Sequence, residues 1–297
     1  YAVITSTGNN VGGLVGYTYQ NAVIENCANF GAVTGGSSVG GIIGGTVSNG
    51  STITGCYNTA EISATGSKAG GIIGGTSSEM TVTSCYNTGK ISGTASGGIA
   101  GEVVEDAAVT IRNCRNYASV TGSFGVGGIL GAVGKGGCAV IERCSNHGEV
   151  TASYQGGGIL GAVGPNRQKD SGAYAQIIDC YNDGGVGGSG AWGNGGILGS
   201  HRTSGTGVAT LLKNCYNAGE VTGSVSGAVI GSVCESDVRL ENVYYLEGTN
   251  AQVSGVFDDD GADTPGTITG GAAVKADAEM RSDGFPALLG SAFAAGE

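Results

Sequence analysis

Few side chains in this chain have the types and spacing needed for acid–base or nucleophilic chemistry. Among its 297 residues are 24 acidic residues and two histidines, His147 and His201. The two histidines occupy different positions within different repeats, so the sequence gives no sign that a Ser, a His and an Asp come together as a catalytic triad. The HExxH motif of metalloproteases does not occur. We therefore expect no enzymatic activity, no catalytic residues and no cofactor.

Nine cysteines are a second candidate for chemistry. No CxxC or CxxxC pair occurs, so the spacing predicts no metal site. Seven of the cysteines are periodic, and we expect them to be small buried hydrophobic residues stacked in a column. Parallel stacked side chains point the same way, which suits disulfide bridging poorly. A cluster of carboxylates at Asp258, Asp259, Asp260 and Asp263 is either a calcium site or, as we favour, a solvated acidic loop.

One group of residues has the composition of a carbohydrate site. Two connections are longer than their counterparts, at 158–180 and 196–215, and in repeat proteins loops inserted on one face often bind partners. A Trp beside Tyr and Arg suits a sugar ring or an acidic glycan. The candidate binding residues are Trp192, Tyr174, Arg167, Lys169, His201 and Arg202. The alternative is ordinary loop variation.

Two sequence blocks alternate along the chain and must position these residues. The first is a Gly-Gly-aliphatic block such as VGGIIG, and its copies begin at Val11, Val39, Ala69, Ser96, Val126, Gly156, Asn194 and Ser226. The second places Asn two residues after Cys, and its cysteines are 29 to 36 residues apart. These cysteines are Cys27, Cys56, Cys85, Cys114, Cys144, Cys180 and Cys215. The asparagines are Asn29, Asn58, Asn87, Asn116, Asn146, Asn182 and Asn217.

The spacing inside each unit predicts short strands. Cys, Asn and a later Val or Ile share a period of two, as in a strand, whereas an aliphatic residue three before the Cys is out of phase. We therefore expect a bend between two strands there, and an Asn column that hydrogen-bonds from turn to turn. Neither block has helical periodicity. The fold predicted is all-β, a parallel β-helix or β-solenoid of about eight turns of roughly 30 residues, right-handed by the usual crossover preference.

Charges at equivalent offsets support this stacking, because they alternate in sign from turn to turn. Arg112 is followed by Glu142, Lys213 by Glu241, and Arg143 by Asp179. Acidic residues in neighbouring units thus face bases rather than one another. This argues against the carboxylate pair of a carbohydrate-active β-helix enzyme.

The GLVG block at Gly13–Gly16 and the later GIIG and GILG blocks, followed by CYN-like turns and VTG, resemble the GLUG repeat. That repeat occurs in secreted and surface proteins of bacteria, including some immunoglobulin A peptidases, where it lies outside the catalytic domain. The resemblance implies an exported bacterial protein, extracellular or at the cell surface. Residues 274–290 look like the short helix and apolar stretch that close such arrays. We expect a solenoid over 1–246 and a cap or linker over 247–297.

Composition narrows the function further. The 62 glycines without a three-residue period exclude collagen, and 40% hydrophobic residues argue against disorder. A net charge of −11 disfavours nucleic acid, and no apolar run is long enough for membrane insertion. We expect a monomeric, non-catalytic spacer or adhesive scaffold whose partner is a host or bacterial glycan or a surface protein. The alternatives are a glycan-binding module that uses the long connections, and a carbohydrate-active enzyme.

Overall fold

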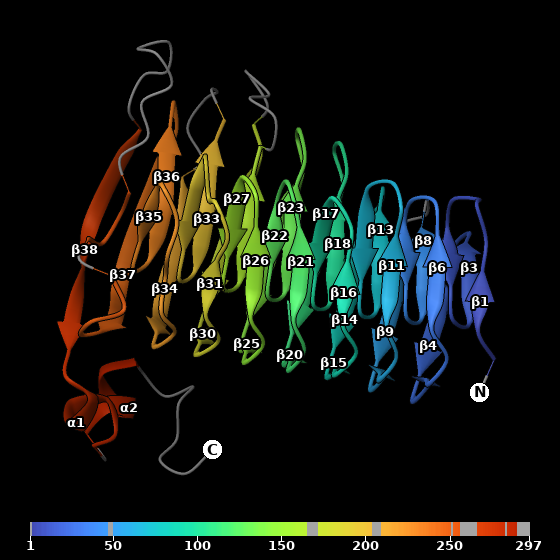
Figure 1. Cartoon of the computed structure of the whole chain (residues 1–297), viewed down its shortest axis with the longest axis horizontal. Coiled ribbons are helices and arrows are strands. Elements are labelled where there is room, and N and C mark those ends of the chain that lie inside the picture. The colour runs from blue at the N-terminus through green and yellow to red at the C-terminus, as the bar shows by residue number, and fades with distance from the viewer. Residues whose placement is uncertain are drawn as a thin grey trace.

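The computed structural model describes residues 2–46, 50–164, 172–203, 209–250, 252–255, 266–282 and 284–289. Within them the chain coils into turns that lie side by side from β1 (Ile4–Thr5) to β38 (Thr267–Lys275) (Figure 1). Each described pair of strands from neighbouring turns is parallel, and these strands form four sheets. The predicted all-β parallel solenoid of about eight turns is confirmed.

Each complete turn passes through five strand positions. The outer sheet contains β1, β6 (Val33–Gly35), β11 (Ile62–Ala64), β16 (Ile91–Ser92), β21 (Val120–Gly122), β26 (Val150–Ala152) and β31 (Val186–Gly187). The inner sheet contains β2 (Val11–Gly12), β7 (Val39–Gly40), β12 (Lys68–Gly70), β17 (Ala95–Gly97), β22 (Val126–Gly127), β27 (Gln155–Gly157), β32 (Gly193–Gly195) and β35 (Ser226–Gly227). The central sheet contains β3 (Val15–Thr18), β8 (Ile43–Thr46), β13 (Ile73–Thr76), β18 (Ala100–Val103), β23 (Leu130–Val133), β28 (Leu160–Val163), β33 (Leu198–Arg202) and β36 (Ile230–Cys234).

The fourth sheet has two limbs. The wall consists of β4 (Val23–Glu25), β9 (Ser51–Thr54), β14 (Met80–Thr83), β19 (Ala108–Arg112), β24 (Cys138–Glu142) and β29 (Tyr174–Ile178). The base consists of β5 (Ala28–Asn29), β10 (Tyr57–Asn58), β15 (Tyr86–Asn87), β20 (Arg115–Asn116), β25 (Ser145–Asn146) and β30 (Tyr181–Asn182). The limbs join at β34 (Thr210–Asn217), which pairs in turn with β37 (Asp237–Leu246), and β37 pairs with β38. Stacking thus continues past residue 246.

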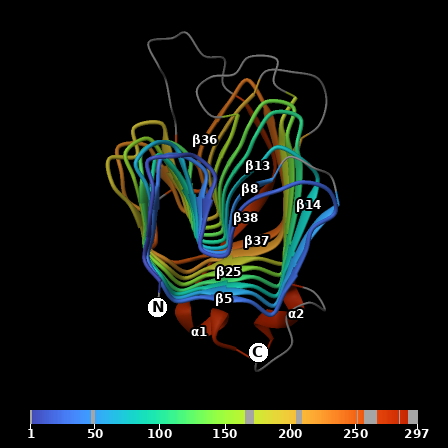
Figure 2. The same ribbon diagram turned by 90° about the vertical axis from the view of Figure 1, so that its right-hand side faces the viewer.

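Seen along the stack, each turn has two lobes rather than one rounded section (Figure 2). The chain descends the wall, crosses the base, rises along the outer sheet, and folds inward between the lobes before leaving along the central sheet. The larger lobe buries one apolar cluster that includes Ile42, Ile53 and Cys56. The smaller lobe buries a separate cluster that includes Val33 and Val39.

The Gly-Gly-aliphatic block makes the inward fold, because its backbones approach too closely for side chains. In the second turn, a Cβ on Gly40 would overlap the carbonyl oxygen of Ile43. A Cβ on Gly41 would overlap the backbone of the next turn and the side chain of Asn58. The aliphatic residue that follows, Ile42, is fully buried. We call this fold the Gly turn.

The expected bend lies one residue before each Cys position. The residue there has a left-handed backbone, with φ between 51° and 64°, in every turn. Asn is among the side chains that tolerate this conformation best, and Gly55 has no Cβ to hinder it. The residues are Asn26, Gly55, Ser84, Asn113, Arg143, Asp179, Asn214 and Asn242. The bend turns the chain from the wall into the base.

The periodic cysteines stack in one column at this corner. The backbone N–H of Cys85 donates to Sγ of Cys114 at 3.4 Å, and the same contact joins Cys114 to Cys144. From Cys56 onward the periodic thiols are at most 1% exposed, and none of the seven forms a disulfide. They are packing residues, as their spacing predicts.

The asparagines form a continuous hydrogen-bonded ladder beneath the Gly turn. Nδ2 of each Asn donates to Oδ1 of the Asn in the next turn at 2.8 to 2.9 Å, from Asn29 through Asn217. Nδ2 of Asn87 also donates to the carbonyl of Gly89, whose N–H donates back to Oδ1. Each Asn amide therefore hydrogen-bonds both to the backbone of its own turn in the base and to the Asn of the next turn.

Surface charges follow the predicted register in part. Arg112 lies 2.8 Å from Glu142, and Lys213 lies 3.4 Å from Glu241, each across adjacent turns. Arg143 instead pairs with Glu142 of its own turn at 2.6 Å. Asp179 accepts a hydrogen bond from the Asn214 amide of the next turn. Arg143 and Asp179, which were expected to face each other across turns, both lie at the left-handed bend and have these other partners instead.

After β38 the chain packs two short helices under the base at the C-terminal end of the stack (Figures 1 and 2). The Glu279 carboxylate caps α1 (Asp277–Met280) by accepting a hydrogen bond from the Ala276 N–H at 3.0 Å. In α2 (Phe285–Leu289), Pro286 lies in the first turn, where proline is tolerated. The Phe285 ring packs edge-on against Tyr216 and Tyr244. Neither helix in this described part has the length and apolarity to cross a membrane.

Substituting an asparagine in the middle of the ladder should strongly destabilise the fold. Asn87→Ala removes the acceptor for Asn58, the donor for Asn116 and both partners of the Gly89 backbone. Buried groups left without partners should lower the free energy of unfolding by about 3 kcal/mol or more, measured by urea denaturation. The control Asn29→Ala, at the ladder's end, loses the bonds to Asn58 and to the Gly31 backbone but no bond from a preceding Asn, so it should cost less, about 2 kcal/mol. Equal losses at both positions would contradict a cooperative ladder.

The cysteine column should be inert in the folded protein. From Cys56 to Cys215 the periodic thiols are at most 1% exposed, so a reagent cannot reach them in the folded state, and burial also raises the pKa of Cys56 to about 11 and that of Cys215 to about 12. Only Cys27 and Cys138 are half-exposed. Titration with a disulfide reagent at mildly alkaline pH should therefore modify these two quickly and all nine only after unfolding. The double variant Cys27→Ser/Cys138→Ser should lose the fast phase, and its persistence would refute the assignment.

Candidate functional site

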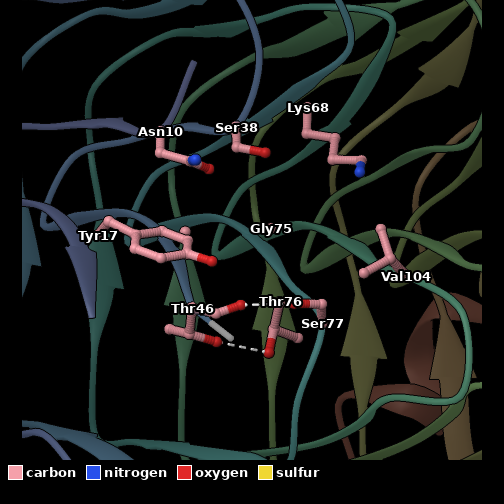
Figure 3. Close-up of a pocket in the computed structure, with 10 residues that line it drawn as sticks. Asn10, Tyr17, Ser38, Thr46, Lys68, Gly75, Thr76, Ser77 and Val104 are labelled. Carbon is pink, nitrogen blue, oxygen red and sulfur yellow. Dashed lines mark hydrogen bonds between the residues drawn. The ribbon is translucent and has the colours of Figure 1, made fainter. Parts of the chain in front are cut away.

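A hollow of about 180 Å³ lies between the inner and central sheets in the first turns (Figure 3). Three polar side chains from successive turns line one side, namely Asn10, Ser38 and Lys68. The opposite side is lined by Tyr17, Gly45, Thr46, Gly75, Thr76 and Ser77, with Val104 at the far end. The site therefore lies between the strands that enter each Gly turn and the strands that leave it.

The hollow exists because one column of the central sheet loses its side chains for two turns. Strand register stacks Tyr17 on Gly45, Gly45 on Gly75, and Gly75 on Glu102. The next two turns carry Ala132 and Ala162 in this column. The glycines therefore leave a gap with an aromatic ring at one end and a carboxylate at the other.

A hydroxyl row from the neighbouring column borders this gap. Oγ1 of Thr46 and Oγ1 of Thr76 lie 2.8 Å apart, and Ser77 Oγ donates to the carbonyl of Thr46 at 2.8 Å (Figure 3). Thr18 continues the row into the first turn, in register with Thr46. Its buried hydroxyl has no hydrogen-bond partner among the described residues.

The one charged pair at the hollow is internally neutralised. Nζ of Lys68 lies 3.5 Å from a carboxylate oxygen of Glu102, and both side chains are about one-fifth exposed. Burial raises the pKa of Glu102, and the adjacent ammonium opposes that rise. The pair therefore adds polarity without a net charge.

None of the residues lining the hollow was among the predicted site residues, although the sequence contains a signal for it. The block that follows the Gly turn is IGGT at Ile43 and again at Ile73, where the next two turns have AGEV at Ala100 and LGAV at Leu130. The extra glycine falls at Gly45 and Gly75. Comparing these blocks position by position would have located a column without side chains.

The structure places the residues that were predicted to bind glycans on different elements, and of these it brings Arg202 and Trp192 together. Tyr174 begins the wall strand β29, in register with Cys138. His201 and Arg202 end the central strand β33 and are only 1% and 4% exposed, so their side chains belong to the interior. Arg167 and Lys169 lie outside the described residues, as does the acidic cluster Asp258, Asp259, Asp260 and Asp263.

Trp192 ends an aromatic row that crosses three turns before the inner strands. The rings of Phe124 and Tyr154 stack with centroids 4.2 Å apart, and the Trp192 ring lies 4.8 Å from Tyr154. The guanidinium of Arg202 lies 5.0 Å from the Trp192 ring centre. One face of Trp192 thus packs with Arg202 and the ring also contacts Tyr154, which reduces the area left for a sugar.

Within the described residues, no group of three or more His, Cys, Asp or Glu side chains is arranged to hold a metal ion. His147 lies on the exposed base beside Asp183, with Nδ1 2.8 Å from a carboxylate oxygen. It is therefore on the outside of the base, whereas His201 is buried.

His201 should make the fold sensitive to acid. Burial lowers its pKa from 6.5 to about 4, so the folded state resists a proton that the unfolded chain accepts. Stability is full above pH 6.5 and falls by about 3 kcal/mol as the pH drops to about 4, at about 1.4 kcal/mol per unit.

The variant His201→Val tests this, because Val163 and Val233 occupy the same column in the adjacent turns. It should lose the His201 part of the acid destabilisation, so its unfolding free energy should approach or exceed that of the wild type near pH 4. Parallel stability curves for the two proteins between pH 7 and pH 4 would show that His201 does not carry the effect.

Comparison with known proteins identifies one known sequence motif in this chain. Residues 7–34 match the model of the GLUG motif. No curated protein matches the chain in sequence. The chain is similar to a crystal structure from Bacteroides ovatus, provisionally named an immunoglobulin A1 protease. The two are 20% identical with a TM-score of 0.43, over 91% of this chain and 70% of that one.

The matched segment covers the strands β2 to β5 and the first two residues of β6, and therefore one passage through the Gly turn, wall, bend and base. It contains Cys27 and Asn29, the first members of their columns. The chain thus carries a GLUG motif in the first turn of a solenoid whose later turns repeat the same Gly-Gly and Cys-x-Asn blocks.

Proposed function

We propose that this solenoid is a non-catalytic repeat domain that serves as a rigid spacer or adhesive scaffold in a bacterial surface or secreted protein. The observation that carries the proposal is the unbroken Asn ladder, which links seven consecutive turns through buried amides. A structure stabilised by nearest-neighbour contacts along one axis is suited to holding other parts at a fixed separation.

The placement of the chain's two described ends supports a spacer. β1 lies at one end of the stack and β38 at the other (Figure 1). With about 4.8 Å between neighbouring strands, eight turns span roughly 38 Å. Segments attached at the two ends would be held apart by that distance. The bacterial and extracellular setting rests on the GLUG motif, and a glycan or surface protein is the partner that we propose.

The pairing of several carboxylates with basic side chains supports a non-catalytic role over a carbohydrate-active enzyme. Glycoside hydrolysis needs two carboxyl groups that face the substrate. Glu142 is paired with Arg112 and Arg143, and Glu241 is paired with Lys213 and Arg239. The carboxylate at the end of the hollow, that of Glu102, is likewise paired, with Lys68 at 3.5 Å.

Single-molecule force spectroscopy tests the spacer role. A chain held by its two ends should keep its length up to a threshold force and then extend in steps of one turn. A turn of about 30 residues should release roughly 100 Å of chain, at about 3.4 Å per residue. Asn87→Ala should lower the force needed near the middle of the stack.

Two results would count against this proposal. One is smooth extension from the lowest forces, which would mean that the stacked turns do not resist load. The other is release of reducing ends from a panel of bacterial and host polysaccharides by the purified chain. Heat-unfolded protein serves as the control for contaminating enzyme activity.

A further inference from the structure

The hollow described above has features of a ligand site that the spacer role does not require. Gly45 and Gly75 are not needed by the fold, because Glu102, Ala132 and Ala162 occupy the same column in later turns. The hollow is thus a local departure from the repeat.

Three polar side chains at the hollow have unused hydrogen-bonding capacity. The Asn10 amide, the Ser38 hydroxyl and the Tyr17 hydroxyl make no side-chain hydrogen bond among the described residues. All three side chains are half-buried, so their groups are presented within a recess rather than on free rotors. Together they offer both donors and acceptors to a ligand.

The charge at the hollow selects for a neutral ligand. Lys68 is the cation that lines it, and its ammonium is already paired with Glu102 at 3.5 Å. An anionic ligand would compete with this carboxylate and lie close to its negative charge. A ligand with many hydroxyl groups can instead bond to Asn10, Ser38 and Lys68 without disturbing the pair.

Size and shape restrict the ligand further. A volume of about 180 Å³ is smaller than the roughly 300 to 1,000 Å³ of sites for drug-sized molecules. The Tyr17 ring closes one end of the hollow and points toward Gly75, which provides an apolar surface beside the polar groups (Figure 3). One pyranose ring combines these requirements, since it has an apolar face and a rim of hydroxyls.

The later turns close the same space. Nε2 of Gln155 donates to Ser200 Oγ at 2.7 Å, and this contact bridges the inner and central sheets. Gln155 and Ser200 are both fully buried. An extended chain of sugars therefore cannot continue along the fold between the sheets, and the hollow holds a single unit.

We infer that the hollow between Asn10, Tyr17 and Lys68 binds one neutral hexose unit of a glycan. This goes beyond the spacer role, which does not depend on it. Hydroxyl groups of the sugar replace water at Asn10, Ser38 and Lys68, and the Tyr17 ring contacts its apolar face. The site would give an adhesive scaffold its contact with carbohydrate.

Saturation-transfer NMR with the whole chain tests the inference. The probes are the methyl glycosides of glucose, galactose, mannose and N-acetylglucosamine, with glucuronate as the anionic comparison. At least one neutral hexoside should bind, with a dissociation constant on the order of a millimolar, and more tightly than glucuronate. Absence of binding by all four, or tighter binding of glucuronate, would overturn it.

Filling the hollow locates the binding. In Gly75→Leu the side chain enters the hollow, since a Cβ there would already lie 3.0 Å from Lys68 Cδ and 3.5 Å from Ser38 Oγ. This variant should lose binding. The matched control is Gly271→Leu, because Gly271 is exposed in the distant strand β38 and a Cβ there meets nothing within 4 Å. The control should bind as the wild type does.

A second variant keeps the test decisive if Gly75→Leu fails to fold. Asn10→Gly removes the amide while suiting the left-handed backbone, where φ is 56°. It should weaken hexoside binding about three- to tenfold, as expected for loss of one hydrogen bond. If Asn10→Gly and a folded Gly75→Leu both bind like the wild type, the sugar lies elsewhere and the inference is wrong. The force measurements above do not depend on this outcome.

Discussion

The structure depends on one buried contact, the amide hydrogen bond between asparagines of successive turns. This bond is possible because the Asn side chain lies directly beneath the Gly turn. A Cβ on Gly41 would overlap Asn58, and a Cβ on Gly128 would overlap Asn146. The glycine of each Gly turn and the Asn beneath it therefore depend on each other in packing, because only a residue without a Cβ leaves room for the Asn amide.

That contact also explains why the solenoid has two hydrophobic cores. The Gly turn descends onto the Asn ladder and separates the interior into a lobe containing the Cys column and a lobe containing the Val33 column. A rounded coil of the same length would have one core. The polar ladder between the lobes is stable because its amides bond to each other and to the base backbone.

The columns were predictable from the sequence, whereas the two-lobed section was not. Period-two spacing identifies which residues share a strand face, and the offset between Ile53 and Cys56 identifies the bend. Nothing in that spacing shows that Gly41 contacts Asn58, because this approach depends on how one turn folds back on itself. The burial of His201 and Arg202 was not predictable for a related reason. They lie inside the long connection 196–215, yet β33 extends through both and buries them.

Glycine therefore has two distinct roles in this chain, and the sequence alone does not distinguish them. At Gly41 it is imposed by backbone overlap, and every described turn from the first to the seventh has Gly at that position. At Gly45 and Gly75 it is a choice, since other turns hold Glu102, Ala132 or Ser200 there. The first kind fixes the fold, and the second kind opens space within it. Because Asn10, Ser38 and Lys68 come from three successive turns, that space keeps its shape only while the ladder holds the register. A binding site of this type is a property of the stack and cannot belong to any single repeat.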